Sequence, residues 1–183
     1  MRTGEAKCFP SFYVIILLSF RISEGLTLEI ISKELTNELW DMFYDDFKFD
    51  PGVQDDDKDW ISVPYENKTF KPNVIWTGQQ EALINSFFEE LIDGNIFALD
   101  WQHDCFAFSP REHIPFEYEY HDDKRDCQVY FPTYYPNGDY HFFFDKECRY
   151  GLLGHPWRNQ IIVIGKELIK KFEDHKRDLN IRY

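Results

Sequence analysis

The stretch 136–157 constrains the fold of this chain more than any other part of it. It opens with Asn137-Gly138, a dipeptide typical of tight turns, and continues into the aromatic run His141-Phe142-Phe143-Phe144. A second apolar segment, which contains two glycines, follows directly. The pattern predicts a turn that leads into a buried strand at 139–145, which returns through a second strand at 148–153.

Helices are predicted in three segments outside 136–157. Aromatic residues fall three or four positions apart over 36–47, with a start as early as Ser32, and a longer apolar face covers 79–92. A third helix follows Gly165. Further strands are predicted at 69–76, 95–102, 129–131 and 160–165. This order predicts an α+β domain over residues 26–183, with a mainly antiparallel sheet of about five or six strands and two or three helices packed on it.

Residues 1–25 precede that domain and interrupt the pattern. Arg2 and Lys7 stand before an apolar run from Phe12 to Phe20, as in a secretory signal, but about ten residues are too few to span a bilayer. The alternatives are a translation start assigned too far upstream and a disordered extension. We therefore expect no membrane association unless residues 1–25 act as a signal or an anchor.

The charge of the chain distinguishes between the classes of partner that it could bind. The chain has 20 Lys and Arg against 33 Asp and Glu, a formal net charge of −13, whereas nucleic-acid binding needs a basic surface. Residues 36–60 hold nine acids and two bases, and Asp55, Asp56 and Asp57 stand together there. The run lacks the alternating oxygen ligands of a calcium loop. The balance favours a basic protein as partner and no nucleic acid, although acidity also keeps an aromatic-rich chain soluble.

Aromatic residues make up 19% of the chain, more than one core of this size is expected to bury. Tyr and Trp are favoured in protein interfaces, so part of this surplus predicts a contact surface. The candidate binding residues are the aromatic side chains beside the polar loops together with the aspartate run: Trp101, Tyr134, Tyr135, Trp157, Asp55, Asp56 and Asp57.

Two clusters carry the candidate catalytic residues. Asp100, His103, Asp104 and Cys105 follow a predicted strand, and His103 is the member whose ordinary pKa lies near neutrality. The competing interpretation is that Asp100 and His103 only hydrogen-bond to loop backbone. His155 heads the second cluster, because the following proline holds it in an extended conformation and Trp157 supplies a stacking face or a cap on the core.

Other signatures are missing from the sequence. It contains no Gly-rich phosphate loop, no nucleophile elbow and no zinc spacing among its His and Cys, so we predict no cofactor and no metal. His141 is expected to face solvent from its strand. Cys8, Cys105, Cys127 and Cys148 form no C-x-x-C pair and indicate reduced thiols in a cytoplasmic protein. A secreted protein is the alternative if residues 1–25 are a signal peptide.

Four segments together resemble a known family. Residues 40–49, 98–105, 136–144 and 154–165, in this order, are similar to the bacterial domain of unknown function 2716. The resemblance covers roughly residues 36–175 and implies a small soluble bacterial domain. It brings no activity and no catalytic residues with it. Proteins of this kind begin close to the first aromatic helix, so residues 1–25 depart from the pattern and support the misassigned start.

The leading hypothesis is therefore a non-enzymatic acidic binding protein, for example an immunity-type protein that neutralises a basic partner. The first alternative is a small hydrolase or transferase that uses His103 or His155 with Asp100 or Asp104. It predicts a concave pocket that joins the two clusters. The second alternative is a small-ligand-binding module with an aromatic-lined cleft.

Overall fold

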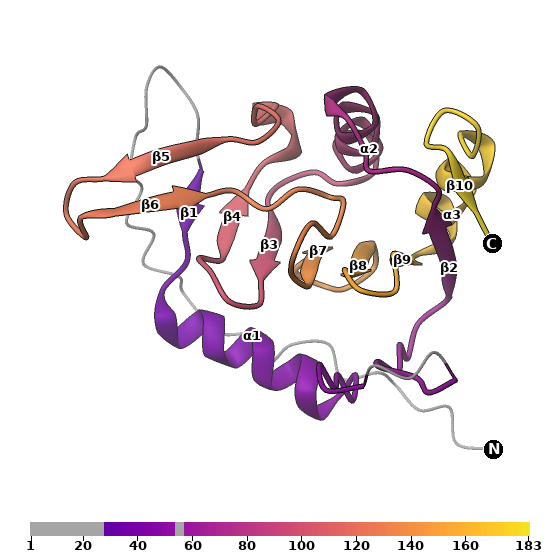
Figure 1. Cartoon of the computed structure of the whole chain (residues 1–183), viewed down its shortest axis with the longest axis horizontal. Coiled ribbons are helices and arrows are strands. Elements are labelled where there is room, and N and C mark those ends of the chain that lie inside the picture. Colours follow the sequence, from indigo (N-terminus) through magenta and orange to yellow (C-terminus); the bar gives the residue numbers. More distant parts are fainter. Residues whose placement is uncertain (1–27, 54–56) are drawn as a thin grey trace.

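The computed structural model describes residues 28–53 and 57–183, and it places one antiparallel sheet between two helical layers. Helix α1 (Lys33–Asp45) covers one face of the sheet, and α2 (Gly78–Leu91) and α3 (Lys166–Asp174) cover the other, as Figure 1 shows. A short 3₁₀ helix, η1 (Pro110–Glu112), follows the fourth strand. The predicted α+β class is confirmed, whereas the segment 1–25 lies outside the described residues.

The sheet is larger than predicted, with eight strands instead of five or six. Every pairing in it is antiparallel. In spatial order the strands are β1 (Glu29–Ile30), β4 (Phe106–Phe108), β3 (Ile96–Asp100), β7 (His141–Asp145), β8 (Gly151–His155), β9 (Gln160–Ile164), β2 (Asn67–Pro72) and β10 (Ile181–Arg182). A separate hairpin of β5 (Glu119–Asp122) and β6 (Cys127–Tyr130) extends outward at the left of Figure 1.

The predicted pair of strands around the aromatic run is confirmed as the β7–β8 hairpin in the middle of the sheet. Successive residues of β7 point to opposite faces. Phe143 packs in the cluster beneath α2 and α3, while Phe142 and Phe144 pack in the cluster beneath α1. Because helices cover both faces, these central strands are buried along their whole length, and their interior residues are apolar on both faces.

Local signals in the sequence explain where two of the helices begin. Ser32 caps α1, and its side chain accepts a hydrogen bond of 3.2 Å from the backbone N–H of Leu35. Thr77 and Gln80 form a reciprocal capping box at the start of α2. These caps fix the helix starts, and the apolar stripes of the helices then fix which side of each faces the sheet.

Candidate functional site

Strand pairing gathers four polar side chains at one end of the sheet. Asp100 is the last residue of β3, and its partner across the pairing is His141, the first residue of β7. His103 follows β3 and Asp139 precedes β7. We call these four residues the β3-end cluster. Asp100, Asp139 and His141 are buried, whereas the His103 side chain is 57% exposed.

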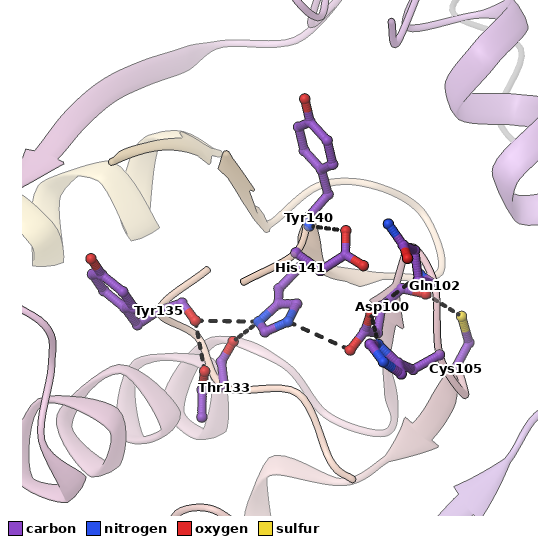
Figure 2. Close-up of polar contacts among 9 residues, drawn as sticks. Asp100, Gln102, Cys105, Thr133, Tyr135, Tyr140 and His141 are labelled. Carbon is purple, nitrogen blue, oxygen red and sulfur yellow. Dashed lines mark hydrogen bonds and ion pairs between the residues drawn. The ribbon is translucent and has the colours of Figure 1, made fainter. Parts of the chain in front are cut away.

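The cluster is held by short polar contacts, most of which Figure 2 shows. Nδ1 of His103 lies 2.8 Å from Oδ1 of Asp100, and Nε2 of His141 lies 3.5 Å from Oδ2 of the same carboxylate. Nδ1 of His141 lies 2.8 Å from the carbonyl oxygen of Thr133 and 3.2 Å from that of Tyr135. Carbonyl oxygens only accept, so this nitrogen carries a proton.

Burial and charge act against each other in this cluster. Burial lowers the pKa of His141, but the Asp100 carboxylate and the two carbonyl oxygens raise it more, so the net pKa lies above its ordinary value. Burial has the opposite effect on Asp100, because it raises the pKa of a carboxylic acid. The hydrogen bonds and charges of His141 and His103 lower the pKa of Asp100 more, so its net pKa lies below the ordinary value. The pKa of Asp139 is raised, chiefly by burial and also by the nearby Asp100 charge.

The other two members of the first predicted cluster do not touch the Asp100 carboxylate, although the Cys105 thiol donates a hydrogen bond of 3.5 Å to the backbone carbonyl of Asp100. Asp104 makes a bidentate ion pair with Arg125, with N–O distances of 2.7 and 2.9 Å. Burial raises the pKa of the Cys105 thiol to about 11, so this cysteine is not an activated thiolate. The structure therefore keeps Asp100 and His103 together and assigns Asp104 to a surface ion pair.

His155, the candidate of the second predicted cluster, lies in the core. Its side chain is fully buried, and its ring meets the rings of Trp60 and Trp157 edge to face. Nδ1 accepts a hydrogen bond of 3.2 Å from the backbone N–H of Arg158, and Nε2 lies 3.3 Å from the hydroxyl of Tyr140. Of two grooves among the described residues, one beside α2 and one beside α1, neither is lined by His103 or His155.

The predicted contact residues differ in their exposure to solvent. Trp157 is 60% exposed and Asp57 is exposed, whereas Tyr134 is buried against Phe88 and contributes nothing to the surface. Tyr135 is half-buried, and its hydroxyl donates to Asn159. Asp55 and Asp56 lie outside the described residues.

The remaining predicted contact residue, Trp101, lines an open groove beside α1. Its Nε1 donates a hydrogen bond of 2.8 Å to the hydroxyl of Tyr44. The groove has a volume of about 370 Å³ and is lined by two residue types, aromatic and polar: Asn37, Trp40, Asp41, Tyr44 and Trp101. Aromatic faces next to a carboxylate are the surroundings that bind an organic cation.

Sequence patterns alone missed part of this arrangement. His141 was expected to face solvent, but this is wrong, since it is only 4% exposed. The role of Asp139 was not identified either. The available signal was the Asn137-Gly138 dipeptide, which predicts that a strand begins nearby but not that His141 stands opposite Asp100.

Comparison with known proteins gives a family and no activity. The family model described as "Protein of unknown function (DUF2716)" matches residues 30–169. The "Uncharacterized protein YxiI" of Bacillus subtilis (strain 168) is 39% identical over 79 residues, which are 43% of this chain and 44% of that protein. The match thus spans less than half of that relative. No solved structure matches significantly, and no helix within the described ranges is long and apolar enough to cross a membrane.

Proposed function

The chain belongs to the DUF2716 family, and on this premise we propose that it is a non-enzymatic binding protein whose α1 surface docks a basic protein, as an immunity protein docks a basic toxin. One observation carries the proposal: an acidic surface lies directly beside the aromatic groove. Charge complementarity is the argument for the occupant.

The acidic surface is formed by α1 and the loop that follows it. Glu34, Glu38, Asp41 and Asp45 recur at intervals of three or four residues, which places them on one side of the helix, and all four are exposed. Within 33–59, the described residues include eight acids and three lysines. We call the exposed acids of this segment the α1 acidic face. Such a concentration attracts a basic partner and accelerates its association.

The groove gives this surface an anchoring point. Trp40, Tyr44 and Trp101 offer aromatic faces, and Asp41 adds a carboxylate from the α1 acidic face itself. A Lys or Arg side chain of the partner would find both a cation–π contact and an ion pair there. Buried aromatic anchors inside a charged rim are the usual source of affinity in protein interfaces.

We also propose a cytoplasmic location for this binding. Cys105 and Cys127 are free thiols, and Cys105 is buried. Free buried thiols are typical of proteins in reducing compartments.

The test compares two triple charge reversals that change the net charge equally. Glu38→Lys/Asp41→Lys/Asp45→Lys alters the α1 acidic face, and Asp93→Lys/Glu119→Lys/Asp123→Lys alters exposed acids elsewhere. A protein captured from lysate on the wild-type chain is purified and titrated against all three by calorimetry at two salt concentrations. We expect a basic protein, bound 1:1 and weakened by salt, whose affinity falls at least about tenfold with the first variant only.

Two results would overturn the proposal. One is that no basic protein binds the purified chain stoichiometrically at low salt. The other is that both triple variants weaken binding equally, since this would assign the attraction to overall net charge and not to the α1 acidic face. A single Trp101→Ala variant then tests the groove, because removal of that ring leaves every charge in place.

A further inference from the structure

We propose that Asp100, His103 and Asp139 bind a divalent transition-metal cation, where β3 ends beside the start of β7. This site belongs to the β3-end cluster and is independent of the α1 acidic face. Each of the three residues offers one ligand atom, and these atoms all lie within 4.8 Å of one another.

The spacing is close to what one ion requires. Metal–ligand bonds of imidazole nitrogen and carboxylate oxygen are about 2.0–2.2 Å long, so atoms bound to one ion lie about 3 to 4.4 Å apart. Nδ1 of His103 and Oδ1 of Asp100 are already 2.8 Å apart.

Asp139 supplies the independent sign of a missing partner. It is 4% exposed, and one of its oxygens accepts a hydrogen bond of 2.7 Å from the backbone N–H of Tyr140. Its other oxygen receives no hydrogen bond from the described residues. No Lys or Arg there forms an ion pair with Asp139, whereas Asp100 is already paired with the imidazoles of His103 and His141 and accepts a hydrogen bond of 3.3 Å from the backbone N–H of Gln102. A buried carboxylate normally has a cation or a full set of donors, and a metal ion would supply that charge.

His141 fits the role of a support for the ligand Asp100. Its Nε2 lies 3.5 Å from Oδ2 of Asp100, on the far side of the carboxylate from His103. Its Nδ1 is anchored on the carbonyl oxygens of Thr133 and Tyr135, so the ring cannot turn freely. Metal-binding carboxylates are commonly held in this way by a neighbouring hydrogen-bonding group.

The donor set selects the class of metal. One imidazole and two carboxylates suit Zn²⁺ or Mn²⁺, whereas Ca²⁺ and Mg²⁺ prefer oxygen ligands alone. Only three protein ligands are offered, so the remaining coordination positions would be left to water or to a further ligand. An open position of this kind is typical of sites that bind a further ligand or activate water.

The experiment titrates the untagged full chain, stripped with a chelator, with MnCl₂ and ZnCl₂. Calorimetry measures stoichiometry for both, and electron paramagnetic resonance follows bound Mn²⁺, which thiols bind poorly. We expect one ion to bind per chain, and we expect the affinity to fall at least tenfold in His103→Ala and in Asp139→Asn. His103 is exposed, and Asn at position 139 can still accept the hydrogen bond from Tyr140, so both variants should fold. Circular dichroism checks this.

His121 provides the matched control. It is an exposed histidine whose Nε2 lies 3.5 Å from Asp126 and 3.8 Å from Asp123, so it mimics the composition of the site without its burial. His121→Ala should leave the affinity unchanged. The proposal is overturned if neither metal binds stoichiometrically, if binding survives both site variants, or if His121→Ala weakens it as much as they do.

Discussion

At the scale of single residues, Glu81 of α2 determines where the loop before β7 lies. Its carboxylate accepts hydrogen bonds of 2.7 Å from the backbone N–H of Tyr134 and 2.9 Å from that of Tyr135. The same loop presents the two carbonyl oxygens that anchor His141. Burial raises the pKa of Glu81 to about 7, although the two amide hydrogen bonds and the His141 charge lower it.

This shift predicts an unusual pH dependence of stability. The folded state binds the Glu81 proton more tightly than the unfolded state does, so the free energy of unfolding falls as pH rises from about 4.5 to about 7. For one proton the slope is at most about 1.4 kcal/mol per pH unit. Urea denaturation of the wild type and Glu81→Gln across pH 4.5–8 measures it.

The glutamine variant cannot titrate at this position, so its stability relative to wild type should rise steadily across that window and then level off. Glu38→Gln, at an exposed position on α1, is the control and should follow the wild-type curve. Parallel curves for wild type and Glu81→Gln would show that Glu81 has an ordinary pKa.

At the scale of elements, the sequence predicts the long helices well and the short strands poorly. The aromatic period and Ser32 predict α1, and the apolar period predicts α2, because each helix has one buried stripe. Strands β1, β4 and β10 have only two or three residues and show no readable period. Strand β4, Phe106-Ala107-Phe108, is buried along its whole length, so it lacks the alternation by which half-exposed strands are recognised.

Only the local part of the candidate site could be predicted from the sequence. Asp100 and His103 are three positions apart, and local sequence suffices to place them together. Their proximity to Asp139 and His141 depends on the register between β3 and β7, which a sequence pattern does not specify. The solvent-facing orientation expected for His141 failed because it assumed one exposed face, while this sheet has helices on both.

The connection between β9 and α3 permits a prediction at this scale. Gly165 has φ +96°, and a Cβ added there would lie 2.3 Å from the carbonyl oxygen of Arg149 and 2.7 Å from the ring of Tyr150. Gly165→Ala should therefore lower the free energy of unfolding by about 3 kcal/mol or more, through backbone strain and overpacking together. Thermal and urea denaturation measure the loss.

Gly94, after α2, separates these two causes. It has φ +132°, but an added Cβ would meet nothing within 4 Å. Gly94→Ala should cost only the conformational strain, about 1–2 kcal/mol. Equal losses at the two positions would mean that the approach of Arg149 to Gly165 does not constrain the fold.

At the scale of the whole molecule, one sheet is shared by two aromatic cores. The cluster beneath α1 contains Trp40 and Trp60, and the cluster beneath α2 and α3 contains Trp76. Central strands contribute to both, since neighbouring residues of β7 and β8 point to opposite faces. Loss of packing on one face therefore removes support from strands that the other face needs, and the two layers should unfold together.

Truncations on opposite faces test this coupling. Leu39 of α1 is 1% exposed and Ile84 of α2 is fully buried, so replacement of either by Ala should lower the free energy of unfolding by about 2–4 kcal/mol. In both variants the tryptophan fluorescence and far-ultraviolet circular dichroism transitions should coincide, because a single cooperative step exposes both cores. Glu38→Ala on the exposed side of α1 should change stability by no more than about 0.5 kcal/mol. If Leu39→Ala instead shifts the fluorescence transition ahead of the dichroism transition, α1 detaches before the sheet melts, and the layer beneath α1 is a separate unit that a docking partner could stabilise by itself.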